Sequence, residues 1–499
     1  MNLAGFNIDT DHYNLVRQVI DEYSHGTIDS VQMSEALKRL AEDPVTPETL
    51  SAAYARISRS DKDIHELRRN ARASVNRARK SNEQIIFGFG HSSVAEHAVF
   101  NLDIGGISRL CIEELEAHRL ASFTESSQRY IRASGGFIIP DEILEIGYGD
   151  RFTDHCRDLF KVYRELTERL EAYHAALPDE IRTGRAREDA RYVLPLSCRS
   201  QVGVTINARV AELLIRTFNR SPLQEVRLLG RQILEEVRRV APSLIRYTEP
   251  KTSRIKVERE LKEAALVLEP ENAAEPIGED VTLLDSPNNC ERHASAAILF
   301  CAGQSSYERA LSAVDRMTPK ERRLLLIRAH GYIDEHEPLR REMELGYFTF
   351  GITLSSSAFA QLKRHRMATL IKQDYNPTLG ATIPPAVEEA GCDNILLEAV
   401  DRSTILYNEI EDKLSPAVKL AAQYALTNAH RRRAILQANA RELTHLARLR
   451  EDADAQWDIR RIANAMIAQA RDACPGLMMF ACGKDRFPEV RAELFRDLE

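Results

Sequence analysis

One short stretch of the sequence places a hydroxyl and a guanidinium at a spacing suited to binding an anion. Ser127 and Arg129 alternate along the chain, so in an extended segment their side chains point the same way. Together they could hold one phosphate group, because the planar guanidinium donates paired hydrogen bonds to phosphate oxygens. The other interpretation, which composition leaves open, is a solvated polar loop.

Three motifs occur twice in the sequence, in the same order. A His-Arg pair follows an apolar stretch at 118–119 and again at 365–366. A Gly-x-x-Ile-Pro turn follows at 136–140 and at 380–384, and an Asn-Ala-Arg triplet ends each series at 207–209 and 439–441, within sequence that we predict to be helical. Ordered repetition of this kind indicates an internal duplication. We therefore expect two copies of one domain.

Helical periodicity dominates the sequence that must position these motifs. Apolar residues recur at helical spacing in three stretches that we predict to be amphipathic helices, Arg151 to Ala176, Pro222 to Val240 and Ser403 to Asn439. Two stretches are typical of strands, Ala98 to Ile104 and Gly346 to Leu354. The expected fold class is α+β, with two tandem copies of a helix-rich domain that each contain a small, mainly antiparallel sheet.

A stretch rich in Pro, Glu, Asn and Asp lies between the two copies and is typical of a linker. We place the first domain at residues 1–255, the linker at 256–288 and the second domain at 289–499, with a boundary near Pro270. A chain of 499 residues is also longer than one ordinary hydrophobic core supports.

The composition excludes several classes of protein. Hydrophobic residues make up 43% and charged residues 29%, as in globular proteins. The net charge of -7 argues against a globally basic nucleic-acid binder. We find no apolar run of the roughly 20 residues that span a bilayer, no signal-peptide core and no C-x-x-C pair. We expect a cytoplasmic protein without a metal site, and with neither nucleic acid nor membrane as a partner.

Several segments of the first copy resemble conserved blocks of the flavin-dependent thymidylate synthases. Ala117 to Tyr130 is similar to that family's signature, Arg-His-Arg, seven residues, Ser, then x-Arg-Tyr. Gly90 to His97 looks like its upstream flavin-binding stretch. Three further segments resemble other blocks of the family, 56–58 more weakly than 190–195 and 205–209.

The resemblance implies most of a binding site in the first copy. The residues implied to bind deoxyuridylate (dUMP) are Glu125, Ser127, Arg129 and Arg191. The residues implied to bind FAD are Ser58, His91, Ser93, Glu96, His118, Arg119, Asn207 and Arg209. The first copy departs from the family at three positions: Ala117 replaces the first signature Arg, Glu114 replaces a Gln, and Phe218 falls where the family has a catalytic Arg. Nearby Arg216 or Arg220 is an alternative for that Arg.

The second copy shows nearly the reverse pattern: it retains family residues at positions where the first copy departs, and it departs at positions that the first copy retains. Its residues that fit the family's flavin, substrate and catalytic positions are Gln361, Arg364, His365, Arg366, Asn439, Arg441 and Arg450. Its departures are Asp374, Asn376 and Gln423, which replace a phosphate-binding Ser and two Arg residues. The resemblance implies that Arg119, Arg364 and Arg450 take part in catalysis. The alternative for residues 364–366 is a basic helix end that makes surface salt bridges.

The resemblance implies reductive methylation of dUMP to dTMP, with methylenetetrahydrofolate as carbon donor and NADPH as reductant of bound FAD. Because that family builds each site from several subunits, we expect composite sites that draw on both copies, in a homodimer that forms a pseudo-tetramer. Two alternatives stay open. One is a catalytically impaired flavin- or nucleotide-binding paralogue with a sensor or assembly role, and the other is a flavin-dependent enzyme acting on another pyrimidine nucleotide or RNA.

Overall fold

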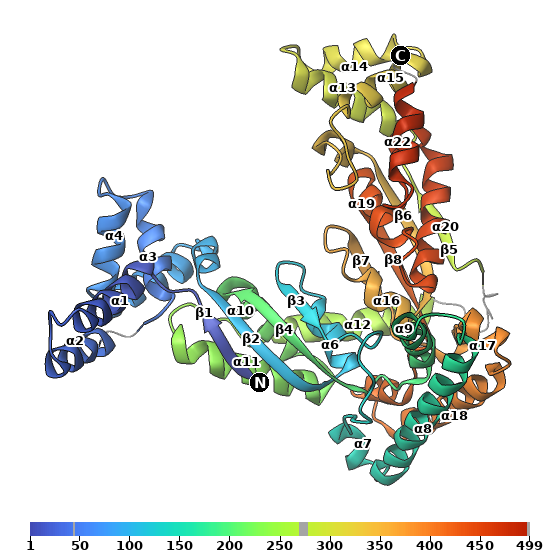
Figure 1. The fold of residues 1–499 in the computed structure, drawn as a ribbon, viewed down its shortest axis with the longest axis horizontal. Helices are drawn as coiled ribbons and strands as arrows, with labels where there is room; N and C mark the ends of the chain where they lie inside the picture. The colour runs from blue at the N-terminus through green and yellow to red at the C-terminus, as the bar shows by residue number, and fades with distance from the viewer. Residues whose placement is uncertain (43–44, 269–277, 497–499) are drawn as a thin grey trace.

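The computed structural model describes residues 1–42, 45–268 and 278–496. Two four-stranded antiparallel sheets lie within these ranges, in the orders β1-β2-β4-β3 and β5-β6-β8-β7 (Figure 1). The two sheets have the same topology, and helices surround both. The expected α+β fold and its duplication are therefore confirmed.

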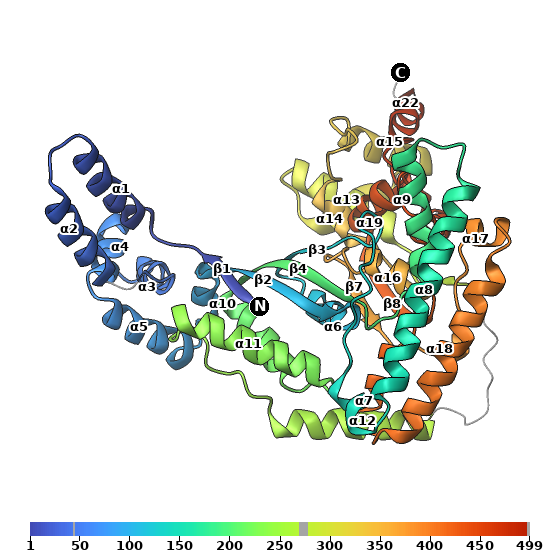
Figure 2. The ribbon, with the colours of Figure 1, turned by 60° about the horizontal axis from the view of Figure 1, so that its bottom comes forward.

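The first copy contains these strands, helices and short 3-10 or π turns: β1 (Asn2–Phe6), α1 (Thr10–Ser24), α2 (Ser30–Glu42), α3 (Glu48–Ile57), α4 (Ile64–Arg72), α5 (Val75–Glu83), η1 (Gln84–Gly88), η2 (Ser92–His97), β2 (Val99–Ser108), α6 (Arg109–Glu116), β3 (Ser122–Glu125), α7 (Asp141–Glu145), α8 (Gly149–Tyr173), α9 (Asp179–Ala190), η3 (Arg191–Val193), β4 (Arg199–Asn207), α10 (Ala208–Phe218), α11 (Gln224–Val240) and α12 (Thr252–Leu268). Helices α1 to α5 form a lobe that stands to one side of the first sheet (Figure 2).

The second copy contains the matching elements: β5 (Val281–Asp285), α13 (Cys290–Ala302), α14 (Tyr307–Asp315), α15 (Pro319–Ala329), η4 (Arg341–Leu345), β6 (Tyr347–Ser355), α16 (Ser356–Leu362), β7 (Thr369–Lys372), η5 (Pro377–Leu379), α17 (Pro385–Glu389), α18 (Asp393–Lys413), η6 (Lys419–Ala425), β8 (Arg431–Asn439), α19 (Ala440–Arg450), α20 (Trp457–Ala473), α21 (Pro475–Met478) and α22 (Phe487–Arg496). No helix in the described ranges combines the length and apolar content needed to cross a membrane.

Both predicted strands and two of the three predicted long helices are present. The strands are β2 and β6, and the helices are α8 and α11. In β2, Phe100, Leu102 and Ile104 are buried, whereas the residues between them are exposed. This alternation gives one face of the sheet to the core, as the period of two along a strand requires.

The predicted helix from Ser403 to Asn439 is wrong. Helix α18 ends at Lys413, and the segment continues through a 3-10 turn into strand β8. The strand is hard to recognise because Arg432 occupies a buried position while Ile435 is exposed, which disguises the alternation. The Asn-Ala-Arg triplets lie at helix starts: each Asn ends a strand and caps the next helix, and the Ala and Arg are the first two residues of that helix.

The expected linker at 256–288 contains ordered structure at both ends. Helix α12 continues to Leu268, and β5 begins at Val281, where it pairs with β6. The second sheet therefore starts before residue 289, because Val281 is buried against β6 although polar residues surround it in sequence. The expected boundary near Pro270 lies outside the described residues.

The two copies are joined by backbone hydrogen bonds and by a shared core. Leu196 N–H donates to the carbonyl of Leu426 (2.8 Å), and Asn428 N–H donates to the carbonyl of Leu194 (2.9 Å). Helices α8 and α18 lie side by side in both views (Figures 1 and 2). One apolar cluster includes residues of both copies, so the copies fold as an intramolecular pseudo-dimer.

Candidate functional site

A cavity of about 610 Å³ lies between the two copies. Both His-Arg segments contribute to its wall, as do the end of β4 and the C-terminal part of α19. Its lining residues include Arg119, Leu120, Asn207, Arg364, His365, Arg366, Met367, Glu442, His445 and Arg450. The structure therefore brings together six cofactor or catalytic residues expected from opposite copies: Arg119, Asn207, Arg364, His365, Arg366 and Arg450.

The two His-Arg segments contact each other directly. Arg119 Nη1 donates to the backbone carbonyl of Ala368, and Arg366 Nη1 donates to the backbone carbonyl of Arg119, each at 3.4 Å. Ser355 caps α16, which ends at Leu362 and leaves the following basic residues in a turn. In this turn, Lys363 and Arg366 contact the other copy, whereas His365 contacts Glu442 and Arg450 of its own copy.

Arg450 and His365 form the part of the cavity wall that the second copy supplies. Arg450 Nε donates to His365 Nε2 (3.1 Å), and Arg450 Nη2 donates to the backbone carbonyl of Gln361 (3.3 Å). Burial, together with Arg364 and Arg129, lowers the pKa of Arg450 to about 10. Burial also lowers the pKa of His365, which favours the neutral imidazole that can accept from Arg450. This end of the cavity holds more positive charge than it can pair internally.

The guanidinium groups expected to bind phosphate lie next to this wall. Burial lowers the pKa of Arg191, and nearby Arg129 and Arg109 lower it further. Arg191 Nε donates to the carbonyl of Glu188 (3.1 Å), but its buried Nη2 has no hydrogen-bond partner. A buried, unpaired donor on a cation carries a free-energy cost that a bound anion would remove. Guanidinium groups of both copies thus lie close together beside the cavity, and one of them has a buried donor without an acceptor.

The segment that carries Ser127 and Arg129 turns sharply instead of running extended. Arg129 N–H donates to Ser127 Oγ (3.2 Å), and Ile131 N–H donates to the Ser127 carbonyl (3.0 Å). The expected same-face geometry of an extended segment is therefore wrong. Arg129 instead forms an ion pair with Glu188, which holds its guanidinium near Arg191.

Glu125 is fixed by a residue that the sequence did not single out. Its carboxylate forms an ion pair with Arg109, the first residue of α6, and both side chains are buried. Burial alone would raise the pKa of Glu125, but Arg109, Lys363 and Arg364 lower it. The carboxylate therefore stays ionised among cations.

A second ion pair that the sequence motifs did not predict joins the two copies beside the cavity. Lys363 Nζ lies 2.7 Å from Glu116 Oε2, and both side chains are buried. Each of these residues lies two positions before the His of its own copy. Their opposite charges at equivalent positions of the sequence indicate a contact between the two copies. The sequence offered no comparable signal for Arg109.

Most of the other expected flavin residues lie outside the cavity wall, with Asn207 as an exception. Arg209 pairs with Glu96, and at the equivalent place Arg441 Nη1 pairs with Glu344 (3.0 Å). Ser58 and Ser93 are exposed, His91 Nε2 lies 3.1 Å from Arg59, and Asn439 caps α19. Asn207, the last residue of β4, lines the cavity and also caps α10, the helix that carries Arg209. The end of β4 therefore connects the cavity to the Glu96–Arg209 pair.

The equivalent substrate position at the other end of the pseudo-dimer is filled by side chains. Lys372 Nζ pairs with Glu114 (2.5 Å), and Arg432 Nη1 pairs with Glu113 Oε2 (3.0 Å). Arg432 also lies over the Tyr375 ring, 3.5 Å from its centroid. Burial alone would raise the pKa of Glu113, but Arg432, Lys363 and Lys372 hold it at about 2.

Three other residues that replace family residues also lie at this filled position. Phe218 is buried against His118, with ring centroids 5.8 Å apart. Gln423 Oε1 accepts from Tyr375 N–H (2.9 Å), and Asn376 caps the short turn η5. Ion pairs between the two copies and packed side chains thus occupy this position. Within the described part of the chain, no group of three or more His, Cys, Asp or Glu residues could hold a metal ion.

The fold and the site define a tandem-duplicated α+β protein with an arginine-rich cavity between its copies. The family model described as thymidylate synthase complementing protein matches residues 39–243 and 282–476, once in each copy. The chain belongs to this family, which confirms the resemblance of its motifs.

Similar proteins fall into two groups. A flavin-dependent thymidylate synthase of Clostridium tetani is 30% identical over 42% of this chain and 86% of its own length. One from Geobacter sulfurreducens is 35% identical over 41% of this chain and 83% of its own length. A UPF0159 protein of Thermoplasma acidophilum is 24% identical over 85% of this chain and 93% of its own length. The first two thus resemble about one copy, and the third spans both.

Proposed function

We propose that the chain catalyses flavin-dependent reductive methylation of dUMP to dTMP at one composite site per chain. The convergence of Arg129, Arg191, Arg364 and Arg450 from two copies carries this proposal. Each of these residues has an uncharged counterpart in the other copy, where the equivalent space is closed by ion pairs. The retained residues therefore belong to one end of the pseudo-dimer.

In this site, Ser127, Arg129 and Arg191 bind the phosphate of dUMP. The unpaired Nη2 of Arg191 supports this role, because a phosphate oxygen would supply the missing acceptor. Glu125 and Gln361 orient the nucleotide. Arg364 and Arg450 lie where their positive charge would polarise the pyrimidine carbonyls, which favours addition to the ring.

The cavity between the His-Arg segments fits the anionic part of FAD. Arg119, Arg366 and Asn207 line it and offer guanidinium and amide donors, which suit a pyrophosphate. When bound, FAD would supply the redox chemistry between NADPH and the pyrimidine, and methylenetetrahydrofolate would supply the carbon. The protein's own part is to align these molecules and to exclude water.

A homodimer that forms a pseudo-tetramer is part of the proposal, as is a cytoplasmic location. Leu120 and Met367 stand on the cavity rim with 78% and 76% of their surface exposed, and a second chain packed there would cover them. All eight cysteines are free thiols, which suits a reducing compartment.

The test is a visible spectrum of the purified chain, followed by an assay of tritium release from ring-tritiated dUMP with methylenetetrahydrofolate and NADPH. Bound flavin with folate-dependent release is the expected result. Flavin and dUMP binding without release would overturn the synthase proposal and favour a binding paralogue. Absence of both ligands would overturn it as well and leave only the fold.

A further inference from the structure

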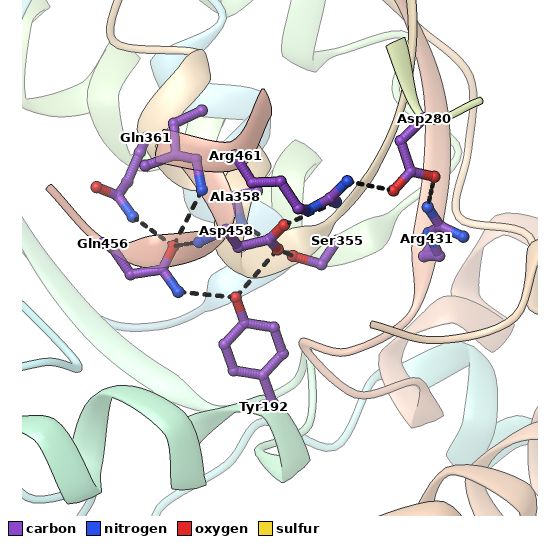
Figure 3. Close-up of polar contacts among 10 residues, drawn as sticks. Tyr192, Asp280, Ser355, Ala358, Gln361, Arg431, Gln456, Asp458 and Arg461 are labelled. Carbon is purple, nitrogen blue, oxygen red and sulfur yellow. Dashed lines mark hydrogen bonds and ion pairs between the residues drawn. The ribbon is translucent and has the colours of Figure 1, made fainter. Parts of the chain in front are cut away.

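A buried tyrosine of the first copy is bonded to a buried carboxylate of the second. Tyr192 Oη donates to Asp458 Oδ2 (3.0 Å), and Ser355 Oγ donates to the same oxygen (2.6 Å), as Figure 3 shows. Asp458 is the second residue of α20, and Ser355 caps α16. We call these three residues the Tyr192 bridge. It ties two helices of the second copy to η3 of the first.

The opposite end of the pseudo-dimer contains the same arrangement. Tyr424 Oη donates to Glu225 Oε2 (2.7 Å), and Ser108 Oγ donates to the same oxygen (2.6 Å). Glu225 is the second residue of α11, and Ser108 caps α6. We call these residues the Tyr424 bridge. Because both bridges use equivalent positions, each is expected to contribute similarly to holding the copies together.

One glutamine distinguishes the two bridges. Gln456 Nε2 donates to Tyr192 Oη (2.9 Å), and Gln361 Nε2 donates to Gln456 Oε1 (3.5 Å), so the hydrogen bonds continue into the substrate site (Figure 3). Tyr192 directly follows Arg191 in the chain. The Tyr192 bridge is thus linked to one expected nucleotide ligand from each copy.

The Tyr424 bridge has no such extension. The position equivalent to Gln456 is Leu223, the residue before α11, whose apolar side chain cannot donate to a tyrosine. At the position equivalent to Gln361, Glu114 pairs with Lys372. This ion pair belongs to the filled end of the pseudo-dimer, where no nucleotide is proposed to bind.

The Tyr192 bridge has a rigid anchor. Asp458 has no exposed surface, and its other oxygen accepts from Arg461 Nη2 (3.2 Å). Arg461 also pairs with Asp280 (2.6 Å), which in turn pairs with Arg431 (Figure 3). A buried carboxylate with several donors is costly to move, since every lost bond exposes an unpaired charge to the interior. The anchor therefore fixes the hydroxyl of Tyr192 and the amide of Gln456.

We propose that Tyr192, Gln456 and Asp458 are positioning residues, which hold the side chains of Arg191 and Gln361 where they can bind the nucleotide. The Tyr424 bridge holds the copies together and does not act on the site. This proposal rests on the proposed function, because it assigns a role to residues around the same dUMP site. None of the three residues needs to touch the nucleotide.

The two bridges supply a matched pair of variants, Tyr192→Phe and Tyr424→Phe, each of which removes one buried hydroxyl. Thermal unfolding and bound flavin should change by similar amounts in both. Titration with dUMP should separate them: we expect the Kd to rise about tenfold in Tyr192→Phe and to stay within about twofold of the unmodified chain in Tyr424→Phe. A purely structural role would change both alike.

Gln456→Asn tests the hydrogen-bonded link between Tyr192 and Gln361 without replacing the tyrosine. Asn caps helices well, so α20 should be retained, but its shorter side chain does not reach both Tyr192 and Gln361. We expect a rise in the Kd for dUMP similar to that of Tyr192→Phe. Two outcomes would overturn the positioning role alone. One is an unchanged Kd for dUMP in Tyr192→Phe and Gln456→Asn, and the other is an equal rise in that Kd in the two Tyr→Phe variants. Failure of the unmodified chain to bind dUMP would overturn the proposed function and this inference with it.

Discussion

The guanidinium of Arg366 donates to the backbone carbonyl of Arg119 at 3.4 Å, although the two residues stand at equivalent places in copies 247 positions apart. Arg119 makes a similar contact in return with the carbonyl of Ala368. The two signature segments therefore face each other across the pseudo-dimer, and the cavity between them belongs to neither copy alone.

Arg191→Gln should weaken dUMP binding while the fold is retained. The second copy already has Gln423 at the equivalent buried position, so this environment accepts a glutamine. Loss of a charge-assisted hydrogen bond costs about 1.5–3 kcal/mol, or roughly a tenfold to hundredfold rise in Kd. Calorimetric titration with dUMP measures it. Arg182→Gln, which removes only the partner of Asp179 on the same helix α9, is the control and should bind dUMP normally.

The chain should bind one dUMP, not two. At the filled end the four arginines of the composite site correspond to Ala117, Phe218, Asn376 and Gln423, and Glu114 is paired with Lys372. A phosphate there would meet carboxylates and would have to displace buried ion pairs. Equilibrium dialysis at saturating dUMP measures the ratio of nucleotide to chain. A ratio of two would contradict the assignment of the filled end.

The repeated motifs were enough to predict the duplication, and the helical and strand periodicity predicted the α+β class. The composite site stays a prediction. Arg119, His365 and Arg366 line one cavity because equivalent segments of two similar domains meet there. The sequence could not show which residues would pair between the two copies. Contacts such as Arg432 with Glu113 join positions 319 residues apart, and no local periodicity encodes them.

Two errors of the sequence interpretation have a common cause. The sequence predicts a helix where strand β8 lies, because Arg432 is buried and Ile435 is exposed, which reverses the polarity expected along a strand. The alternation of Ser127 and Arg129 suits an extended segment, whereas Ser127 accepts from the backbone of Arg129 and starts a turn. In both segments charged side chains are placed by partners in other elements, so local propensity was overridden.

Arg432→Met should destabilise the fold strongly through the filled end. The variant leaves the buried carboxylate of Glu113 without its closest cation, and breaking such a pair costs about 3–5 kcal/mol. Glu113→Gln combined with Arg432→Met removes both charges and should recover part of the loss. Urea unfolding of the two single variants and the double variant gives the coupling free energy. Strictly additive losses would show that the pair is not energetically coupled.

His430 should make stability depend on pH between about 4 and 6.5. Burial lowers the pKa of His430 to about 4, and its Nδ1 accepts from Thr427 N–H (3.0 Å), so no proton can be added there without losing that bond. An unfolded imidazole titrates near about 6.5, so the unfolded chain binds the proton more tightly. The contribution to stability is complete above that value and is lost as the pH falls through about 4, by up to about 3 kcal/mol.

The measurement compares urea unfolding at pH 7.5 and pH 5.0 in the unmodified chain and in His430→Gln. The comparison with the variant is needed because burial raises the pKa of Asp189 and Glu451 to about 7, which changes stability in the opposite direction over this range. His430→Gln should lose less stability on acidification than the unmodified chain. His336→Gln, which replaces a solvent-exposed imidazole, serves as the control and should leave the difference between the two pH values unchanged. Equal pH responses in all three proteins would show that His430 is protonated as readily in the folded as in the unfolded chain.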